Sequence, residues 1–332
     1  GDRAHPLTED DATIPLFHND RWQTVRLRDT THAVEREYLD VDGNRRAVLH
    51  LPAEVPPSSS LTVSVTYEIE STDRQRPEII PADAGSFSEI PPGLLEEFTA
   101  ETETFTSGDE EVRTLALRLA ADETTVLGAV TRLLDWIMAE ISYRNFEVPR
   151  YPGETLAGGE GDCDDQALLL IAMCRALGIP SFLQVGVVFS GAIESERTSW
   201  GGHLRIKQRG VGWHGWAMVY IPPWGWLPID LTIQKSRDPF RLIAEAPEYK
   251  GQFVTAMNIS RQAYIGDSRR SREELMSSGL HITVSEMWVR SGSADRRTTL
   301  ILVVLGVSVS SALVVAIILR GRRPFQKNRG YS

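Results

Sequence analysis

The sequence predicts an α+β protein followed by one membrane-spanning helix, and three observations carry this prediction. An apolar helical pattern begins at Cys163, patterns typical of β-strands stand before and after it, and residues 298–319 carry no charge. The chain has 332 residues, of which 42% are hydrophobic. It is therefore long enough and apolar enough to form two domains with buried cores.

The first part of the chain has the pattern of β-structure. Residues 1–20 are polar, and we expect them to be loosely ordered. Between residues 61 and 70, apolar residues alternate with Thr, Ser and Glu, which is typical of a strand with one buried face. Asp42-Gly43 marks a turn between two other extended stretches. We therefore predict a small β-sandwich-like module in residues 1–75, followed by a surface connection rich in Pro and Glu.

Three predicted helices lead to and include a cysteine. Segments 109–120 and 124–140 have helical patterns. A third helix is expected from Cys163 onward, because no Pro or Gly interrupts the sequence until Gly178 and Pro180 end it. Asp162 occupies the N-cap position of this helix, so Cys163 falls in its first turn. There the helix dipole favours thiolate over thiol. We expect the thiol to lie at the exposed tip of an otherwise buried helix.

A histidine and an aspartate follow in a predicted hairpin. A buried strand is expected at 182–189 and a loop at 190–203. An alternating strand then begins at His214, and a Pro-rich turn returns the chain through a second strand that ends near Asp230. In such a hairpin the Asp230 carboxylate can hold one nitrogen of His214 while the other nitrogen faces the thiol of Cys163. Acyl-transfer chemistry requires this combination of nucleophile, base and orienting group.

Other assignments compete with this one. His203 is a rival base, although the glycines before it predict a loop. Tyr143 is a candidate donor to an oxyanion, and core packing explains this residue equally well. The carboxylates around Cys163 are hard ligands whereas its thiolate is soft, so we expect no metal site. Cys174 lies about 16 Å from Cys163 along the helix, beyond the reach of a disulfide, and is expected in the core.

The residues around the cysteine and the histidine resemble those of the transglutaminase-like superfamily in its prokaryotic form. The matching motifs are Gly161-Asp162-Cys163, Arg175-Ala176-Leu177-Gly178-Ile179-Pro180, His214-Gly215-Trp216 and Asp230. The resemblance implies a papain-like domain in which Cys163, His214 and Asp230 form the catalytic triad. It implies an enzyme that acts on peptide or carboxamide bonds without a cofactor.

The chain departs from the family pattern directly after the cysteine. Aromatic or glutamate residues are common there in the family, whereas this chain has Asp164 and Asp165. Two nearby carboxylates oppose the formation of a thiolate, so the thiol is expected to be less reactive than the motif alone implies.

The carboxyl-terminal part predicts a membrane anchor. As a helix, residues 298–319 would span about 33 Å, enough to cross a bilayer. Five basic residues follow this stretch and only two immediately precede it, which predicts an extracellular catalytic domain and a cytoplasmic carboxyl terminus. The predicted units are a β-rich module at 1–75, a catalytic domain at 76–265, a juxtamembrane segment at 266–297, the membrane helix at 298–319 and a basic tail at 320–332.

Charge and motifs together favour one function and leave one alternative. A net charge of −10, with no basic patch outside the carboxyl terminus, argues against nucleic-acid binding. The favoured function is a membrane-anchored thiol enzyme, either a peptidase or amidase or an acyltransferase, with protein or peptide substrates. The alternative is a surface binding or scaffolding protein that keeps the fold without turnover, which the acidic pair after Cys163 supports.

Overall fold

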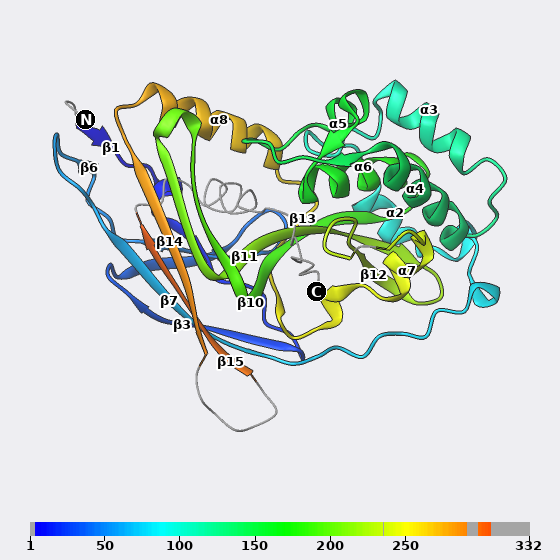
Figure 1. Ribbon diagram of the computed structural model, residues 1–332, viewed down its shortest axis with the longest axis horizontal. Coiled ribbons are helices and arrows are strands. Elements are labelled where there is room, and N and C mark those ends of the chain that lie inside the picture. Colours follow the sequence, from blue (N-terminus) through cyan, green and yellow to red (C-terminus); the bar gives the residue numbers. More distant parts are fainter. Residues whose placement is uncertain (1–3, 235, 291–297, 307–332) are drawn as a thin grey trace, which may run out of the picture.

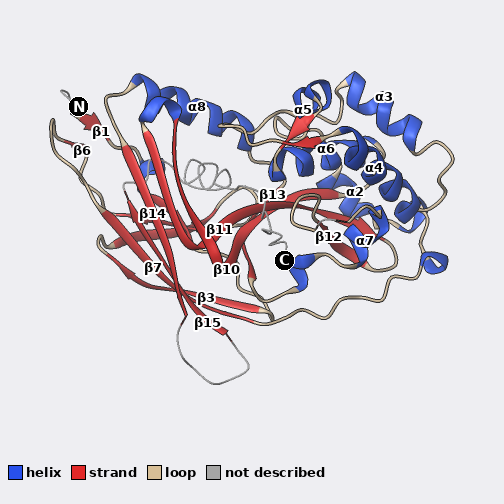
Figure 2. Cartoon of the chain, in the orientation of Figure 1, coloured by secondary structure: helices blue, strands red, loops and turns tan. Residues whose placement is uncertain are grey.

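The computed structural model describes residues 4–234, 236–290 and 298–306, and it contains an extended β-structure with most helices gathered at one end (Figure 1, Figure 2). The strands are β1 (His5–Pro6), β2 (Thr13–Pro15), β3 (Gln23–Thr30), β4 (Val34–Leu39), β5 (Arg45–Leu49), β6 (Glu54–Val55), β7 (Val63–Ser71), β8 (Ser142–Tyr143), β9 (Glu160–Gly161), β10 (Ser181–Ser199), β11 (Leu204–Ile221), β12 (Gly225–Ile229), β13 (Phe253–Ile259), β14 (Ile282–Arg290) and β15 (Thr298–Gly306). The helices are α1 (Glu9–Ala12), α2 (Pro92–Phe98), α3 (Glu110–Leu119), α4 (Val126–Glu140), α5 (Pro152–Gly158), α6 (Cys163–Ala176), α7 (Pro239–Ala244) and α8 (Tyr264–Ser277).

One eight-stranded sheet organises the molecule. Its strands follow the order β13-β10-β11-β14-β15-β7-β3, and β12 also pairs with β11. The first half of β11 pairs with β14 in parallel, whereas its second half pairs with β12 in antiparallel register. Because β11 continues through both halves, strands β3 and β7 from the start of the chain share a sheet with β10 and β11 from its middle.

Helix α6 is buried along almost its whole length, as its apolar sequence predicts. Leu168, Leu169, Leu170 and Ile171 are completely buried, and the helix packs against β10, β11 and helices α3, α4 and α5. Burying one such side chain contributes about 1.5–3 kcal/mol, so these contacts fix the helix firmly. Helix α6 therefore provides a rigid mount for the residue at its first turn.

Most of the predicted elements are confirmed, including the helices before and at Cys163 and the alternating strand at 61–70. In β7, every second residue from Val63 to Ser71 is buried. The expectation for residues 1–20 is wrong in part. The apolar segment Thr13-Ile-Pro-Leu-Phe17 is buried, and the Phe17 ring packs against Tyr67 and Trp213 at centroid distances of 5.0 and 5.9 Å.

The expected loop at 190–203 is also wrong. Strand β10 continues to Ser199, and the reversal is confined to a 3-10 turn, Trp200–Gly202. Gly201 has a φ of +63° and Gly202 a φ of +96°, so these two glycines supply the left-handed backbone that the turn needs. In this part of β10, charged and small residues alternate because the strand forms one arm of a hairpin and one of its faces is exposed.

The structure corrects the start of the expected membrane helix. Residues Thr298–Gly306 form strand β15, which pairs with both β7 and β14 in antiparallel register. An apolar run rich in Val, Ile and Leu fits a strand between two others as well as it fits a helix, and here the open edges of β7 and β14 accept it. Residues 307–319 lie outside the described residues. In the part of the chain that the structure describes, no helix is long and apolar enough to span a membrane. The orientation expected from the basic residues stays a prediction.

Candidate active site

Cys163 is the first residue of α6. Asp162 is the N-cap residue, and its carbonyl oxygen accepts the first helical hydrogen bond from the backbone N–H of Gln166 at 3.1 Å. The position of the cysteine at the positive end of the helix dipole is therefore confirmed. Its expected exposure is wrong, because Cys163 is only 3% exposed. The first turn of α6 is covered by neighbouring segments, so a substrate carbonyl would have to reach a thiol below the surface.

The two acidic residues after the cysteine make structural hydrogen bonds. The Asp165 carboxylate accepts from the backbone N–H of Arg150 at 2.7 Å and from that of Asp162 at 3.2 Å. The Asp164 carboxylate accepts from the Tyr264 hydroxyl at 2.8 Å. Both carboxyl groups are buried. They stabilise the first turn of α6, which gives their presence beside Cys163 a structural reason.

His214 and Asp230 meet as the predicted hairpin requires. His214 lies inside β11, and Asp230 follows the last residue of β12. The Nε2–H of His214 donates to Asp230 Oδ2 at 2.7 Å, and both side chains are buried. The other oxygen of Asp230 accepts from the backbone N–H groups of Thr232 and Ile233 at 2.8 and 3.0 Å, so the carboxylate is held on both sides.

The charge on Asp230 results from two opposing effects. Burial disfavours its ionised form, whereas the neighbouring imidazole of His214 and the hydrogen bonds favour it, and together they hold the pKa of Asp230 below its ordinary value. Asp230 is therefore a carboxylate at neutral pH. Because Nε2–H donates to this carboxylate, a neutral His214 ring has its proton on Nε2 and its lone pair on Nδ1.

A glycine brings β11 against the first turn of α6. A Cβ atom built on Gly215 would lie 3.3 Å from the Cβ and 3.6 Å from the Cα of Asp164. The backbone after His214 therefore passes directly beside the residue that follows Cys163. A larger side chain at position 215 would push this part of the strand away from the first turn of the helix.

Glu248 is a member of this cluster that the sequence did not reveal. It lies in a 3-10 turn, Pro247–Tyr249, is only 2% exposed, and its Oε1 is 3.9 Å from His214 Nε2. Burial first, and then the Asp230 carboxylate, raises the pKa of Glu248 well above its ordinary value. No periodic pattern surrounds Glu248 in the sequence, and a solvated surface glutamate would have the same local neighbours.

Aromatic rings surround the histidine. Trp216 and Phe253 lie beside the His214 ring at centroid distances of 5.8 and 6.5 Å. Trp216 is buried and covers Gly186, where an added Cβ would come within 2.7 Å of its Cη2 atom. These tryptophan and phenylalanine side chains are core residues that exclude water from the His214–Asp230 pair.

Two other candidates lie in different settings. Tyr143 pairs with Gly161 in the short β8–β9 sheet, and Gly161 precedes Cys163 by two residues. The Tyr143 hydroxyl donates to Asn145 Oδ1 at 3.2 Å. His203 lies at the tip of the β10–β11 hairpin, where its Nδ1 is 2.7 Å from the carbonyl oxygen of Leu280. Its ring stacks on His281 with the centroids 4.5 Å apart. His203 is thus engaged far along the hairpin from the His214–Asp230 pair.

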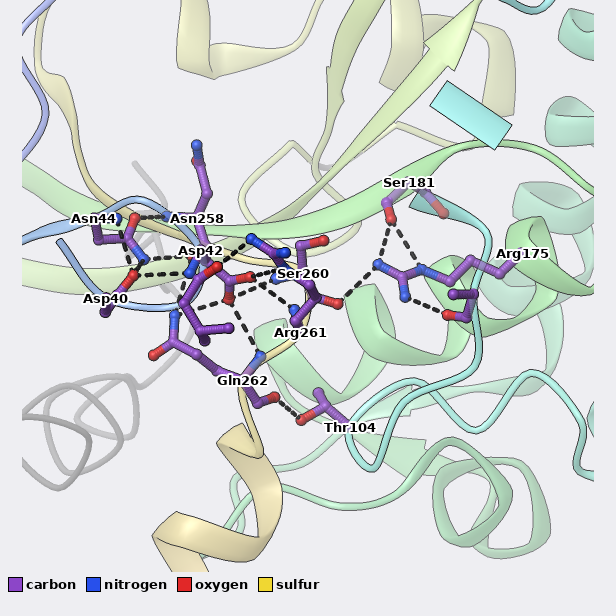
Figure 3. Close-up of polar contacts among 12 residues, drawn as sticks. Asp40, Asp42, Asn44, Thr104, Arg175, Ser181, Asn258, Ser260, Arg261 and Gln262 are labelled. Atoms are coloured by element: carbon purple, nitrogen blue, oxygen red, sulfur yellow. Dashed lines mark hydrogen bonds and ion pairs between the residues drawn. The ribbon is translucent and has the colours of Figure 1, made fainter. Parts of the chain in front are cut away.

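The opposite end of α6 is anchored without a carboxylate. The Arg175 guanidinium donates to the carbonyl oxygens of Ser181 and Ser260 (Figure 3) and to that of Ala100, at distances between 2.7 and 3.3 Å. It also lies 4.0 Å from the centre of the Phe105 ring. Burial lowers the pKa of Arg175 to about 9. Four carbonyl bonds and one ring replace the counter-ion that a buried cation usually has.

A series of hydrogen bonds connects the β4–β5 turn to Asp164 in the first turn of α6. Figure 3 shows the buried Asp42 carboxylate accepting from the loop after β13, including the backbone N–H of Gln262 at 3.2 Å. The hydroxyl of Thr104 donates to the carbonyl oxygen of Gln262 at 2.6 Å, and the oxygen of that hydroxyl accepts from the backbone N–H of Tyr264 at 2.8 Å. Tyr264 in turn binds Asp164. The N-terminal segment thus contributes to the positioning of the first turn of α6.

Two sets of described residues could bring three metal-binding atoms together. They are Asp162, Cys163 and Asp164, and His214, Asp230 and Glu248. The first set combines a soft thiolate with hard carboxylates, a mixture that suits no common ion well. In the second set, the imidazole nitrogen that would bind the ion is already bonded to Asp230.

The central part of the chain is similar to one known protein family. Residues 113–231 match the family described as the Transglutaminase-like superfamily, and this segment contains Cys163, His214 and Asp230. No curated protein matches the chain in sequence.

Several solved structures are similar at low sequence identity. A candidate cysteine protease from Cytophaga hutchinsonii is 18% identical with a TM-score of 0.45, over 75% of this chain and 75% of the other. The periplasmic domain of TgpA from Pseudomonas aeruginosa, bound to ethylmercury, is 16% identical with a TM-score of 0.31, over 70% and 92% of the two chains. A red sea bream transglutaminase is 10% identical with a TM-score of 0.33, over 89% and 53%.

Proposed function

From the transglutaminase-like domain that holds Cys163, His214 and Asp230, we propose that the protein is a thiol enzyme that cleaves or transfers amide bonds. The observation that carries this proposal is the buried 2.7 Å hydrogen bond between His214 and Asp230, on a strand that touches the first turn of α6. These positions supply a nucleophile, a base and a group that orients the base.

The reaction would proceed through an acyl-enzyme. The Cys163 thiolate attacks the carbonyl carbon of a peptide bond or carboxamide. The imidazolium of His214 gives its proton to the leaving nitrogen as the C–N bond breaks, which leaves a thioester on Cys163 and releases an amine or ammonia. Water or a second amine, deprotonated by His214, then attacks the thioester and restores the thiolate. We favour water as the acceptor, so that the protein acts as a peptidase or amidase.

Asp230 would act by orientation and charge. Its carboxylate accepts the Nε2 proton, so the tautomer with the lone pair on Nδ1 is favoured and Nδ1 becomes the base for the thiol. The same carboxylate stabilises the imidazolium that forms when the thiol loses its proton. Because its pKa is held below the ordinary value, Asp230 keeps this charge at neutral and mildly acidic pH.

A binding protein without turnover is the second candidate. The deep burial of Cys163 favours it, because a substrate must displace neighbouring segments to reach the thiol. This candidate predicts that the His214–Asp230 pair serves stability alone.

The two candidates are separated by turnover on peptide and carboxamide libraries. The test compares the wild-type chain with Cys163→Ala and with Cys174→Ala as a matched control. We expect Cys163→Ala to lose all activity and to stay folded. Cys174→Ala should keep its activity and lose some stability, because it removes a buried sulfur from the core. Equal activity in Cys163→Ala and the wild type would exclude the proposed mechanism.

A further inference from the structure

Glu248 brings a second buried carboxyl group to the histidine. Asp230 Oδ2 lies 2.7 Å and Glu248 Oε1 lies 3.9 Å from the same atom, His214 Nε2. All three side chains are at least 98% buried, and their polar atoms lie within 4.8 Å of one another. One imidazole can compensate one carboxylate here, so a second negative charge in this space would be strongly disfavoured.

Among the described residues, the groups that favour an ionised Glu248 are few and weak: its own backbone N–H and the distant guanidinium of Arg74. Neither of its oxygens accepts a well-aligned hydrogen bond from a donor among the described residues. The groups that face it are Asp230, His214, Tyr249 and, more distantly, Arg74, whose guanidinium lies 3.8 Å from Asp20 and has the weakest influence on Glu248. A buried carboxyl group without well-aligned donors is stable only when it holds a proton or a metal ion.

The geometry favours a proton over a metal ion. His214 Nε2 and Asp230 Oδ2 are already joined by a 2.7 Å hydrogen bond, so a metal would have to break it to bind both atoms. Asp230 Oδ1 is saturated by backbone donors, which leaves Oδ2 as the acceptor for a second bond. One carboxyl oxygen of Glu248 and one of Asp230 lie within 4.8 Å of each other, inside the same buried cluster as His214. An O–H···O⁻ bond between an acid and a carboxylate is among the strongest hydrogen bonds in proteins.

We propose that Glu248 is a neutral carboxylic acid whose O–H donates to Asp230, and that it acts as a positioning residue for the His214–Asp230 pair. The proton holds Asp230 Oδ2 in line with His214 Nε2 and keeps the site at one negative charge. Glu248 therefore acts on the base only through Asp230. This role extends the proposed function, on which it rests.

The protonation state can be measured without any enzymatic activity. Infrared difference spectra between the wild type and Glu248→Gln, both as full chains at pH 6, should show a carboxylic acid C=O band that only the wild type has. The band should vanish as the pH is raised through the pKa of the group. A difference spectrum that contains only carboxylate bands would overturn the proposal, even if the protein proves to have no activity.

The positioning role is tested by the reactivity of Cys163 with iodoacetamide, in a Cys174→Ala background. Glu248→Leu removes the donor and should slow alkylation about tenfold, the effect of one lost hydrogen bond to a charged group. Glu248→Gln keeps a neutral donor of the same shape and should restore most of the rate. Equal rates in the two variants would contradict the role. Stoichiometric bound metal, with a rate that changes on chelation, would show that a cation takes the place of the proton.

Discussion

The two faces of strand β11 hold buried carboxyl groups in different ways. Trp213 and His214 are neighbours and point to opposite faces. On one face the Trp213 indole N–H and the Gln208 amide donate to Glu286 at 2.9 and 2.8 Å. On the other face His214 meets Asp230 at 2.7 Å. The carboxyl groups are almost equally buried, so the difference between the faces lies in their partners.

The partners decide which carboxyl group stays charged. The partners of Glu286 are neutral, and burial raises its pKa to about 7 in spite of their hydrogen bonds. Asp230 faces an ionisable ring, and its pKa stays below the ordinary value in spite of the same burial. Of the two carboxyl groups, only Asp230 therefore keeps its full negative charge at neutral pH, whereas Glu286 is partly protonated there. The Trp213 face resembles a structural polar contact within the sheet.

The largest expected effect separates the two faces by function. His214→Ala should lower turnover about 10³-fold, because it removes the general base and acid. Trp213→Phe should leave turnover within a few-fold of wild type and lower the free energy of unfolding by about 1–3 kcal/mol, since Glu286 loses a buried donor. Steady-state kinetics and urea unfolding measure the two effects. Activity that depends on Trp213 and not on His214 would contradict the assignment of the site to the face of β11 that carries His214.

The next effect concerns the contact between β11 and α6. Gly215→Val places a side chain where Asp164 already lies, so it should cost about 1–3 kcal/mol of stability and reduce the reaction of Cys163 with thiol reagents. Gly191→Ala is the control, because nothing lies within 4 Å of a Cβ at that position. Wild-type behaviour of Gly215→Val would show that the strand and helix do not meet as described.

The third expected effect is a pH dependence of the free energy of unfolding, caused by Glu286 on the Trp213 face. The folded pKa of Glu286, about 7, lies above the unfolded value of 4.5, so the native state binds the extra proton between these values. Its contribution is fully present below pH 4.5 and is lost as the pH rises to about 7, a change of up to about 3 kcal/mol. Glu286→Gln should remove this slope and be more stable than wild type at pH 8. Parallel unfolding curves for the two proteins from pH 4 to 8 would contradict the assignment.

The smallest effect is expected at the hairpin tip. His203→Ala should change turnover little and stability by about 0.5 kcal/mol or less, because the ring lies near the surface against His281 and one carbonyl group. Turnover assays alongside His214→Ala provide the comparison. A loss of activity in His203→Ala as large as that in His214→Ala would make His203 the base.

The sequence revealed the parts of the site that short-range patterns encode. The N-cap before Cys163, the lack of helix breakers after it and the alternation after His214 depend on residues close together in the chain. They placed Cys163, His214 and Asp230 on the elements where the structure has them. The β10–β11 arm was missed because Gly191 and Gly201 suggested a loop, although only the second of these occupies a turn.

The remaining parts depend on contacts between distant residues. Tyr264 binds Asp164 across 100 positions of sequence, and Glu248 reaches His214 from a turn without periodicity. The apolar run at 298–306 was assigned to a membrane helix because a buried strand has the same composition, and only the pairing with β7 and β14 distinguishes them. Tertiary pairing, not local propensity, decided each of these cases.

The central claim is that His214 activates Cys163 across the contact between β11 and α6. The most direct test is the second-order rate of alkylation of Cys163 by iodoacetamide at pH 7, measured by mass spectrometry in a Cys174→Ala background with and without His214→Ala. We expect faster labelling than that of an unfolded control peptide, and a large loss of rate in His214→Ala. Labelling that is slow in both proteins, or equally fast in both, would contradict the claim.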